Sequence, residues 1–76
     1  MNVREAVQKM GGLTKGKHAY RIGFVNISEV DDETELDVSS IKELEDLWAS
    51  LVSEFECKVD SITYIEPAFY DDPDEV

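Results

Sequence analysis

The clearest pattern of apolar and polar positions lies between Ser40 and Glu56. Apolar residues recur there three or four positions apart, the spacing that places side chains on one face of an α-helix. They are Ile41, Leu44, Leu47, Trp48, Leu51, Val52 and Phe55. Ser40 is suited to cap the first turn, with Glu43 reaching back to it in a reciprocal capping box. The sequence therefore predicts an amphipathic helix that must bury its apolar face against a sheet.

A second, shorter amphipathic helix is predicted at the start of the chain. Asn2 can cap this helix, with Glu5 three positions later, and Gly11-Gly12 ends it because glycine tolerates a left-handed C-terminal turn. The apolar positions of this helix are Val3, Ala6, Val7 and Met10.

Alternating apolar positions predict three strands, over 18–27, 33–38 and 59–66. In the first strand Tyr20, Ile22 and Phe24 share the face that should meet the long helix. In the second, Leu36 and Val38 point inward. For the third, simple alternation places Ile62 and Tyr64 on one face and Thr63 and Ile65 on the other. Gly23 marks a bulge or a close approach of another group to the backbone.

These elements predict an α+β domain of two layers, in the order α-β-β-α-β. The first two strands form a hairpin, and a right-handed crossover through the long helix leaves strands two and three parallel. The first strand is the most apolar, so we place it in the centre of a three-stranded mixed sheet of order 2-1-3. Both helices are expected on one face of that sheet, leaving the other face open.

Composition narrows the class of protein. The 76 residues suffice for one domain, which we place at 1–70, followed by an acidic disordered tail at 71–76. The chain has one cysteine and no apolar run of signal-peptide or transmembrane length. We therefore expect a cytoplasmic protein with no membrane partner.

Candidate catalytic and metal-binding groups are scarce. His18 and Cys57 are the only residues of their kind and belong to different elements, so neither a nucleophile–base pair nor a zinc site is expected. The carboxylates at 31, 33, 35 and 37 alternate as in an EF-hand loop, but Leu36 replaces its glycine and Lys42 its bidentate glutamate. We expect no enzyme, no cofactor and no metal ion.

Charge is distributed unevenly along the chain. There are 18 acidic and 7 basic residues, a formal net charge of −11. Residues 1–21 carry five basic residues against Glu5, whereas 22–76 carry 17 carboxylates against Lys42 and Lys58. This balance argues against nucleic acid or an anionic membrane as the partner and permits a basic protein. Acidity also simply keeps small proteins soluble, an interpretation of equal weight.

The leading hypothesis is a small non-enzymatic module whose acidic surface binds a basic protein. Its candidate residues are Asp31, Asp32, Glu33, Glu35, Asp37, Glu43, Glu45, Asp46 and Glu54. In its narrowest form the module is an inhibitor, of the kind that phages or mobile elements encode, which imitates nucleic-acid charge and blocks a nucleic-acid-handling protein. That form rests on an analogy of size and charge. It needs the acids of 31–37 and of the tail on one side, because the helix alone is too sparsely charged.

The alternative hypothesis is a self-associating adaptor, a homodimer formed through the open face of the sheet. Its interface residues would be Val25, Ile27, Ile65, Phe69 and Tyr70. A third hypothesis, direct binding of nucleic acid by the basic residues between Arg4 and Arg21, is disfavoured by repulsion from the remaining carboxylates.

Overall fold

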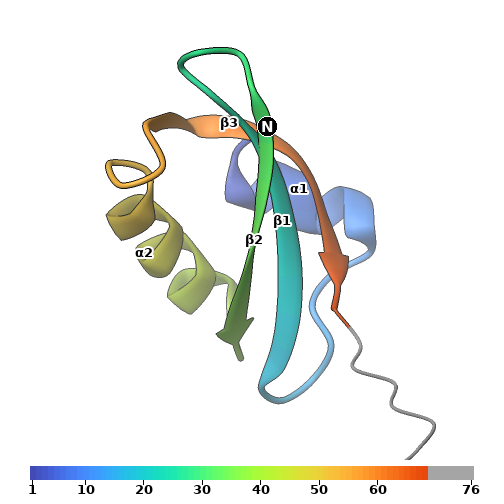
Figure 1. Ribbon diagram of the computed structural model, residues 1–76. Helices are drawn as coiled ribbons and strands as arrows, with labels where there is room; N and C mark the ends of the chain where they lie inside the picture. Colours follow the sequence, from blue (N-terminus) through green and yellow to red (C-terminus); the bar gives the residue numbers. More distant parts are fainter. Residues whose placement is uncertain (69–76) are drawn as a thin grey trace, which may run out of the picture.

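The computed structural model describes residues 1–68, in which two helices and one three-stranded sheet follow each other in the order α-β-β-α-β (Figure 1). The elements are α1 (Val3–Met10), β1 (His18–Asn26), β2 (Asp31–Val38), α2 (Ile41–Leu51) and β3 (Cys57–Pro67). The predicted α+β class and element order are confirmed. Phe69, Tyr70 and the predicted acidic tail at 71–76 lie outside the described residues.

The strands are arranged β2-β1-β3, as predicted, with β1 in the centre (Figure 1). The prediction of a mixed sheet is wrong, because β1 pairs antiparallel with both of its neighbours. Strands β2 and β3 do run in the same direction, but they flank β1 and never pair with each other. A parallel crossover connection therefore produces no parallel pair when a third strand separates its two ends.

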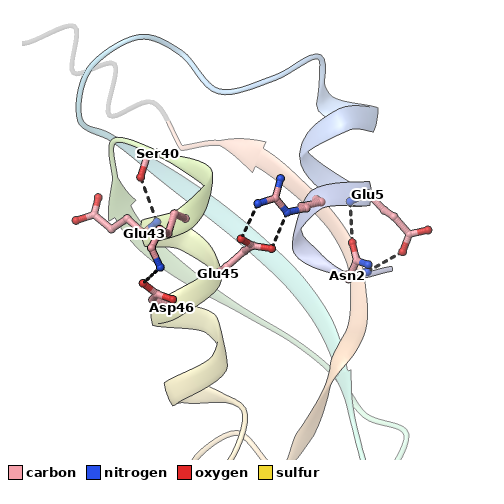
Figure 2. Close-up of polar contacts among 8 residues, drawn as sticks. Asn2, Glu5, Ser40, Glu43, Glu45 and Asp46 are labelled. Atoms are coloured by element: carbon pink, nitrogen blue, oxygen red, sulfur yellow. Dashed lines mark hydrogen bonds and ion pairs between the residues drawn. The ribbon is translucent and has the colours of Figure 1, made fainter.

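The predicted N-terminal helix is present, and its first turn carries the reciprocal capping box (Figure 2). The side chain of Asn2 accepts the N–H of Glu5 at 2.8 Å, and the carboxylate of Glu5 accepts the N–H of Asn2 at 3.1 Å. Gly11 ends the helix with φ at 101°, and its N–H bonds to the carbonyl of Val7. This left-handed turn is the one for which glycine has no steric penalty.

Helix α2 differs from its prediction at both ends. Its cap is one-sided, because Ser40 accepts the N–H of Glu43 at 3.1 Å but Glu43 accepts the N–H of Ser39 instead of Ser40. Its α-helical part ends at Leu51, and residues 52–56 form turns. The N–H of Cys57 bonds to the carbonyl of Val52, so this turn replaces the last helical residues and leads directly into β3.

Trp48 lies at the centre of the core. Its ring meets Phe24 of β1 edge-on at 5.3 Å between centroids, and Phe55 lies 6.2 Å away. The indole Nε1–H donates to the carbonyl of Val59 at 2.9 Å, so the polar atom of this buried side chain has a partner. One cluster of buried side chains joins both helices to the sheet, and it contains Val3, Ala6, Val7, Tyr20, Ile22, Phe24, Val38, Leu44, Trp48, Ile62 and Ile65. The expectation that Leu47 is buried is wrong, since it is 37% exposed.

A bulge in β3 overturns the predicted faces of that strand. Gly23 is paired with Tyr64 but Phe24 with Ile62, so Thr63 has no opposite residue on β1. The extra residue shifts the alternation by one position. Ile62 and Ile65 are therefore both buried, and Tyr64 turns to the opposite face, where it is exposed.

The beginning of the chain covers part of the β3 edge that faces away from β1. The amino group of Met1 donates to the carbonyls of Asp60 and Ile62, both at 2.8 Å. The N–H of Ile62 returns a bond of 3.2 Å to the carbonyl of Met1. These contacts give hydrogen-bond partners to backbone groups that the irregular part of β3 would otherwise leave without one.

Replacement of Trp48 by alanine tests the core. We expect Trp48→Ala to lower the free energy of unfolding by about 3 to 5 kcal/mol, because it leaves a cavity beside Phe24 and removes the donor to Val59. Urea denaturation followed by circular dichroism measures this loss. The control is Leu47→Ala on the same helix, which should cost less than about 1 kcal/mol because that side chain is partly exposed. Equal costs for the two variants would contradict the described packing.

Candidate functional site

Strand β2 presents four carboxylates on one side of the sheet. Asp31, Glu33, Glu35 and Asp37 occupy every second position and are all exposed. Leu36 and Val38, which alternate with Glu35 and Asp37, are turned toward the core, as predicted. On β1 the residues opposite the four carboxylates are Val25, Gly23, Arg21 and Ala19. We call this surface, completed by Tyr64 and Glu66 of β3, the acidic face.

Arg21 stands in the middle of the acidic face and connects the three strands. Its Nη2 lies 3.1 Å from a carboxylate oxygen of Glu35 on β2, and its Nη1 lies 3.1 Å from one of Glu66 on β3. The hydrogen bond to Glu35, followed by that to Glu66, raises the pKa of Arg21 above its ordinary value. The guanidinium is therefore permanently charged, and it offsets part of the acidity of five carboxylates.

Tyr64 makes a second connection across the sheet. Its ring lies over Gly23, where an added Cβ would come closer than 3.0 Å to three ring carbons. The phenolic O–H continues past β1 and donates to the carboxylate of Glu33 at 2.8 Å. The hydrogen bond to Glu33 raises the pKa of Tyr64, since it favours the protonated phenol, and desolvation acts in the same direction. Of the two alternatives predicted for Gly23, the close approach is present at Gly23 itself, whereas the bulge lies opposite it on β3.

Asp31 and Asp37 lie at the two ends of the acidic face. Within residues 1–68 neither side chain has a hydrogen bond or an ion pair. The carboxylates between them belong to the network around Arg21 and Tyr64. The acidic face therefore has a centre that is ordered by contacts between strands and two ends whose carboxylates have no partner within residues 1–68.

The carboxylates of α2 belong to a different surface, on the helix that packs through Leu44 and Trp48 against the opposite side of β1. Glu45 forms an ion pair with Arg4 of α1 at 3.0 Å, and Asp46 one with Lys42 at 3.3 Å (Figure 2). The carboxylate of Glu43 accepts the N–H of Ser39, as described above. Each of these acids therefore has a partner within the fold.

Two further candidate acids lie apart from the acidic face. Asp32 alternates to the other side of β2 from Glu33, and its carboxylate accepts the N–H of that neighbour at 2.8 Å. Glu54 is exposed in the turns after α2. Of the nine predicted acidic residues, the structure brings only Asp31, Glu33, Glu35 and Asp37 together.

The residues predicted for a homodimer interface are dispersed. Ile65 is only 6% exposed and belongs to the core, whereas Ile27 is 67% exposed in the turn after β1. Val25 is half-buried at the end of the acidic face. Phe69 and Tyr70 lie outside the described residues. The described residues do not form one continuous apolar interface from this set.

Arg21, Tyr64 and Glu66 take part in the site although the sequence analysis did not assign them to it. The two β3 residues were missed because regular alternation places Tyr64 on the core side. The sequence signal is that the two isoleucines of this strand, Ile62 and Ile65, are three positions apart, so regular alternation cannot bury both of them.

In the described part of the chain no group of three or more histidine, cysteine, aspartate or glutamate residues is arranged to hold a metal ion. Within residues 1–68, neither helix has the length and apolar character needed to cross a membrane. The chain matches no family model, no curated protein and no solved structure. The arrangement of charges is therefore the basis for any assignment of function.

The bond between Tyr64 and Glu33 can be tested by titration. Tyr64 should ionise above its ordinary pKa of 10.0, and Glu33→Gln should lower that pKa because the negative acceptor is lost. Resonances of ¹³C-labelled tyrosine, assigned with Tyr64→Phe, measure this value. Because the raised pKa belongs to the folded state, the associated stability is present below pH 10 and lost as the pH rises through the folded-state value. A pKa that Glu33→Gln leaves unchanged, or changes no more than the control Asp37→Asn, contradicts the bond.

A double-mutant cycle tests the contact between Tyr64 and Gly23. We expect Gly23→Ala to destabilise the fold by about 1 to 3 kcal/mol, because the new methyl group displaces the ring. In a Tyr64→Ala background the same substitution should be neutral or stabilising, since the space is then free and alanine is the better strand residue. Chemical denaturation of the four proteins gives the coupling energy. Equal effects of Gly23→Ala in both backgrounds would show that the ring does not lie over Gly23.

Proposed function

We propose that this protein is a non-enzymatic, cytoplasmic binding module whose acidic face recognises a basic protein. The observation that carries the proposal is the row of Asp31, Glu33, Glu35 and Asp37 on one side of β2. An exposed, single-sign surface steers an oppositely charged partner and fixes its orientation. In this proposal both helices lie on the other side of the sheet, so that nothing in the described chain covers the acidic face.

The spacing of the carboxylates favours the recognition of basic side chains on a protein partner. It does not favour mimicry of a nucleic-acid duplex. Successive carboxylates on β2 are about 6.8 Å apart, twice the rise per residue of an antiparallel strand. A DNA duplex presents one charge per about 1.7 Å, roughly four times as many over the same length. Inhibition of a nucleic-acid-handling protein by a phage or mobile-element product stays a prediction, and charge density is not an argument for it.

The acidic face also bears on self-association. Two copies that met through this surface would place like charges opposite each other, which is unfavourable. The homodimer hypothesis stays a prediction. Because of this repulsion it depends on surfaces other than the acidic face, and Ile65 contributes little to any interface because it is buried.

The proposal is tested by capturing proteins from cell extract on the immobilised chain and on two charge-matched variants. Asp31→Asn/Asp37→Asn removes two charges from the acidic face, and Asp46→Asn/Glu54→Gln removes two from other surfaces. We expect a basic protein that the parent and the second variant retain and that the first variant does not. High salt should release this protein from the parent and from the second variant. The proposal would be refuted if the captured proteins were the same at low and high salt and the same for the parent and the Asp31→Asn/Asp37→Asn variant.

A further inference from the structure

The two edges of the sheet differ in what covers them. Backbone atoms of Met1 bond to Asp60 and Ile62 along part of the outer edge of β3. On β2 one edge pairs with β1, and within residues 1–68 no strand pairs with the other. An unpaired edge is a template on which an extended segment of another chain can form a further strand.

The side chains of β2 restrict which segments can use this edge. A second copy of β2 would place its own carboxylates beside those of the first. A neutral strand would gain backbone hydrogen bonds but no charge attraction to offset the desolvation of the row. A strand with lysine or arginine at every second position has the matching repeat of about 6.8 Å. Its cations would alternate onto the acidic face and meet carboxylates directly across the new pair.

We propose that the partner segment is an extended basic peptide that adds to the free edge of β2 as a fourth strand. Backbone hydrogen bonds supply part of the affinity, and basic residues at alternate positions supply the specificity. Asp31 and Asp37 are the principal contacts, because within residues 1–68 their carboxylates have no other partner. β2 has eight residues, so the matching segment is also about eight residues long. This inference rests on the proposed function. It adds that the ligand is extended and that its basic residues recur at every second position.

The test uses a synthetic octapeptide in which arginine alternates with valine or threonine, residues that favour extended structure. Two further peptides carry N-methyl groups on the backbone amides. In one peptide the amides of the arginines are methylated, and in the other the amides of the residues between them. Only one of these two sets faces β2 in an added strand, because successive amides of a strand point to opposite edges. We expect one methylated peptide to bind at least ten times more weakly than the parent peptide, and the other to bind like the parent. Fluorescence anisotropy at low salt measures the three dissociation constants.

Charge variants complete the test. Asp31→Asn/Asp37→Asn should raise the dissociation constant of the parent peptide by about twofold to thirtyfold, the range for loss of two exposed ion pairs. Asp46→Asn/Glu54→Gln should leave this constant unchanged. In bound protein, amide hydrogen exchange of β2 should slow relative to the free state.

Two results would overturn the inference. Equal binding of both methylated peptides would mean that charge alone attracts the ligand, which contradicts strand addition but leaves the proposed function intact. Failure of the parent peptide to bind at millimolar concentration also refutes strand addition. The proposed function is judged separately, by the salt-dependent capture of a basic protein described above, which does not involve this peptide.

Discussion

The packing of Trp48 against Phe24 determines which side of the sheet is buried. Successive side chains of a strand point to opposite faces, so once Phe24 is fixed against the helix, Tyr20 and Ile22 are buried with it. The residues between them, including Arg21, must then face the other way. Pairing transmits this choice from β1 to both neighbouring strands, because residues opposite each other in a ladder share a face. The acidic face follows from an aromatic contact on the other side of the sheet.

Much of this architecture could be predicted from the sequence, because its main elements follow strong local rules. The apolar spacing around Trp48, the capping residue Asn2 and the alternation of β2 each involve residues close together in the chain. Glu33, Glu35 and Asp37 could be assigned to one face for the same reason, whereas Asp31 lies outside the strand predicted over 33–38 and joins them because β2 begins two residues earlier. Strand order also followed, because the most apolar strand belongs in the centre of a sheet.

The features that could not be predicted depend on contacts between distant residues. The bulge in β3 is set by pairing with β1 and by the ring of Tyr64, which needs the space above Gly23. After α2 the chain turns within residues 52–56 and then pairs Cys57 with Asn26, a contact between residues far apart in the sequence. The partners of the helix acids were equally inaccessible, since Arg4 and Glu45 are 41 positions apart. As a result, the prediction placed nine carboxylates on one surface, whereas four of them share the acidic face.

The acidic face is an organised surface, and its order explains how so small a domain can display concentrated charge. Arg21 links Glu35 to Glu66, and Tyr64 links β3 to Glu33, so the centre of the row is held by contacts across all three strands. At the ends of the row, Asp31 and Asp37 have no partner within residues 1–68, and the proposed ligand would contact them there. Position within the fold, which the total of −11 does not describe, distinguishes the acids that share this face from the acids of α2.

The orientation of the sheet is tested most directly by nuclear Overhauser effects in solution. The indole protons of Trp48 should show contacts to the ring of Phe24, and the ring of Tyr64 should show contacts to the α-protons of Gly23 on the other side of the sheet. Contacts from the Trp48 indole to Arg21 or Tyr64 would mean that the helix lies over the carboxylates. In that case the acidic face would be covered, and both the binding site and the ligand proposed for it would be wrong.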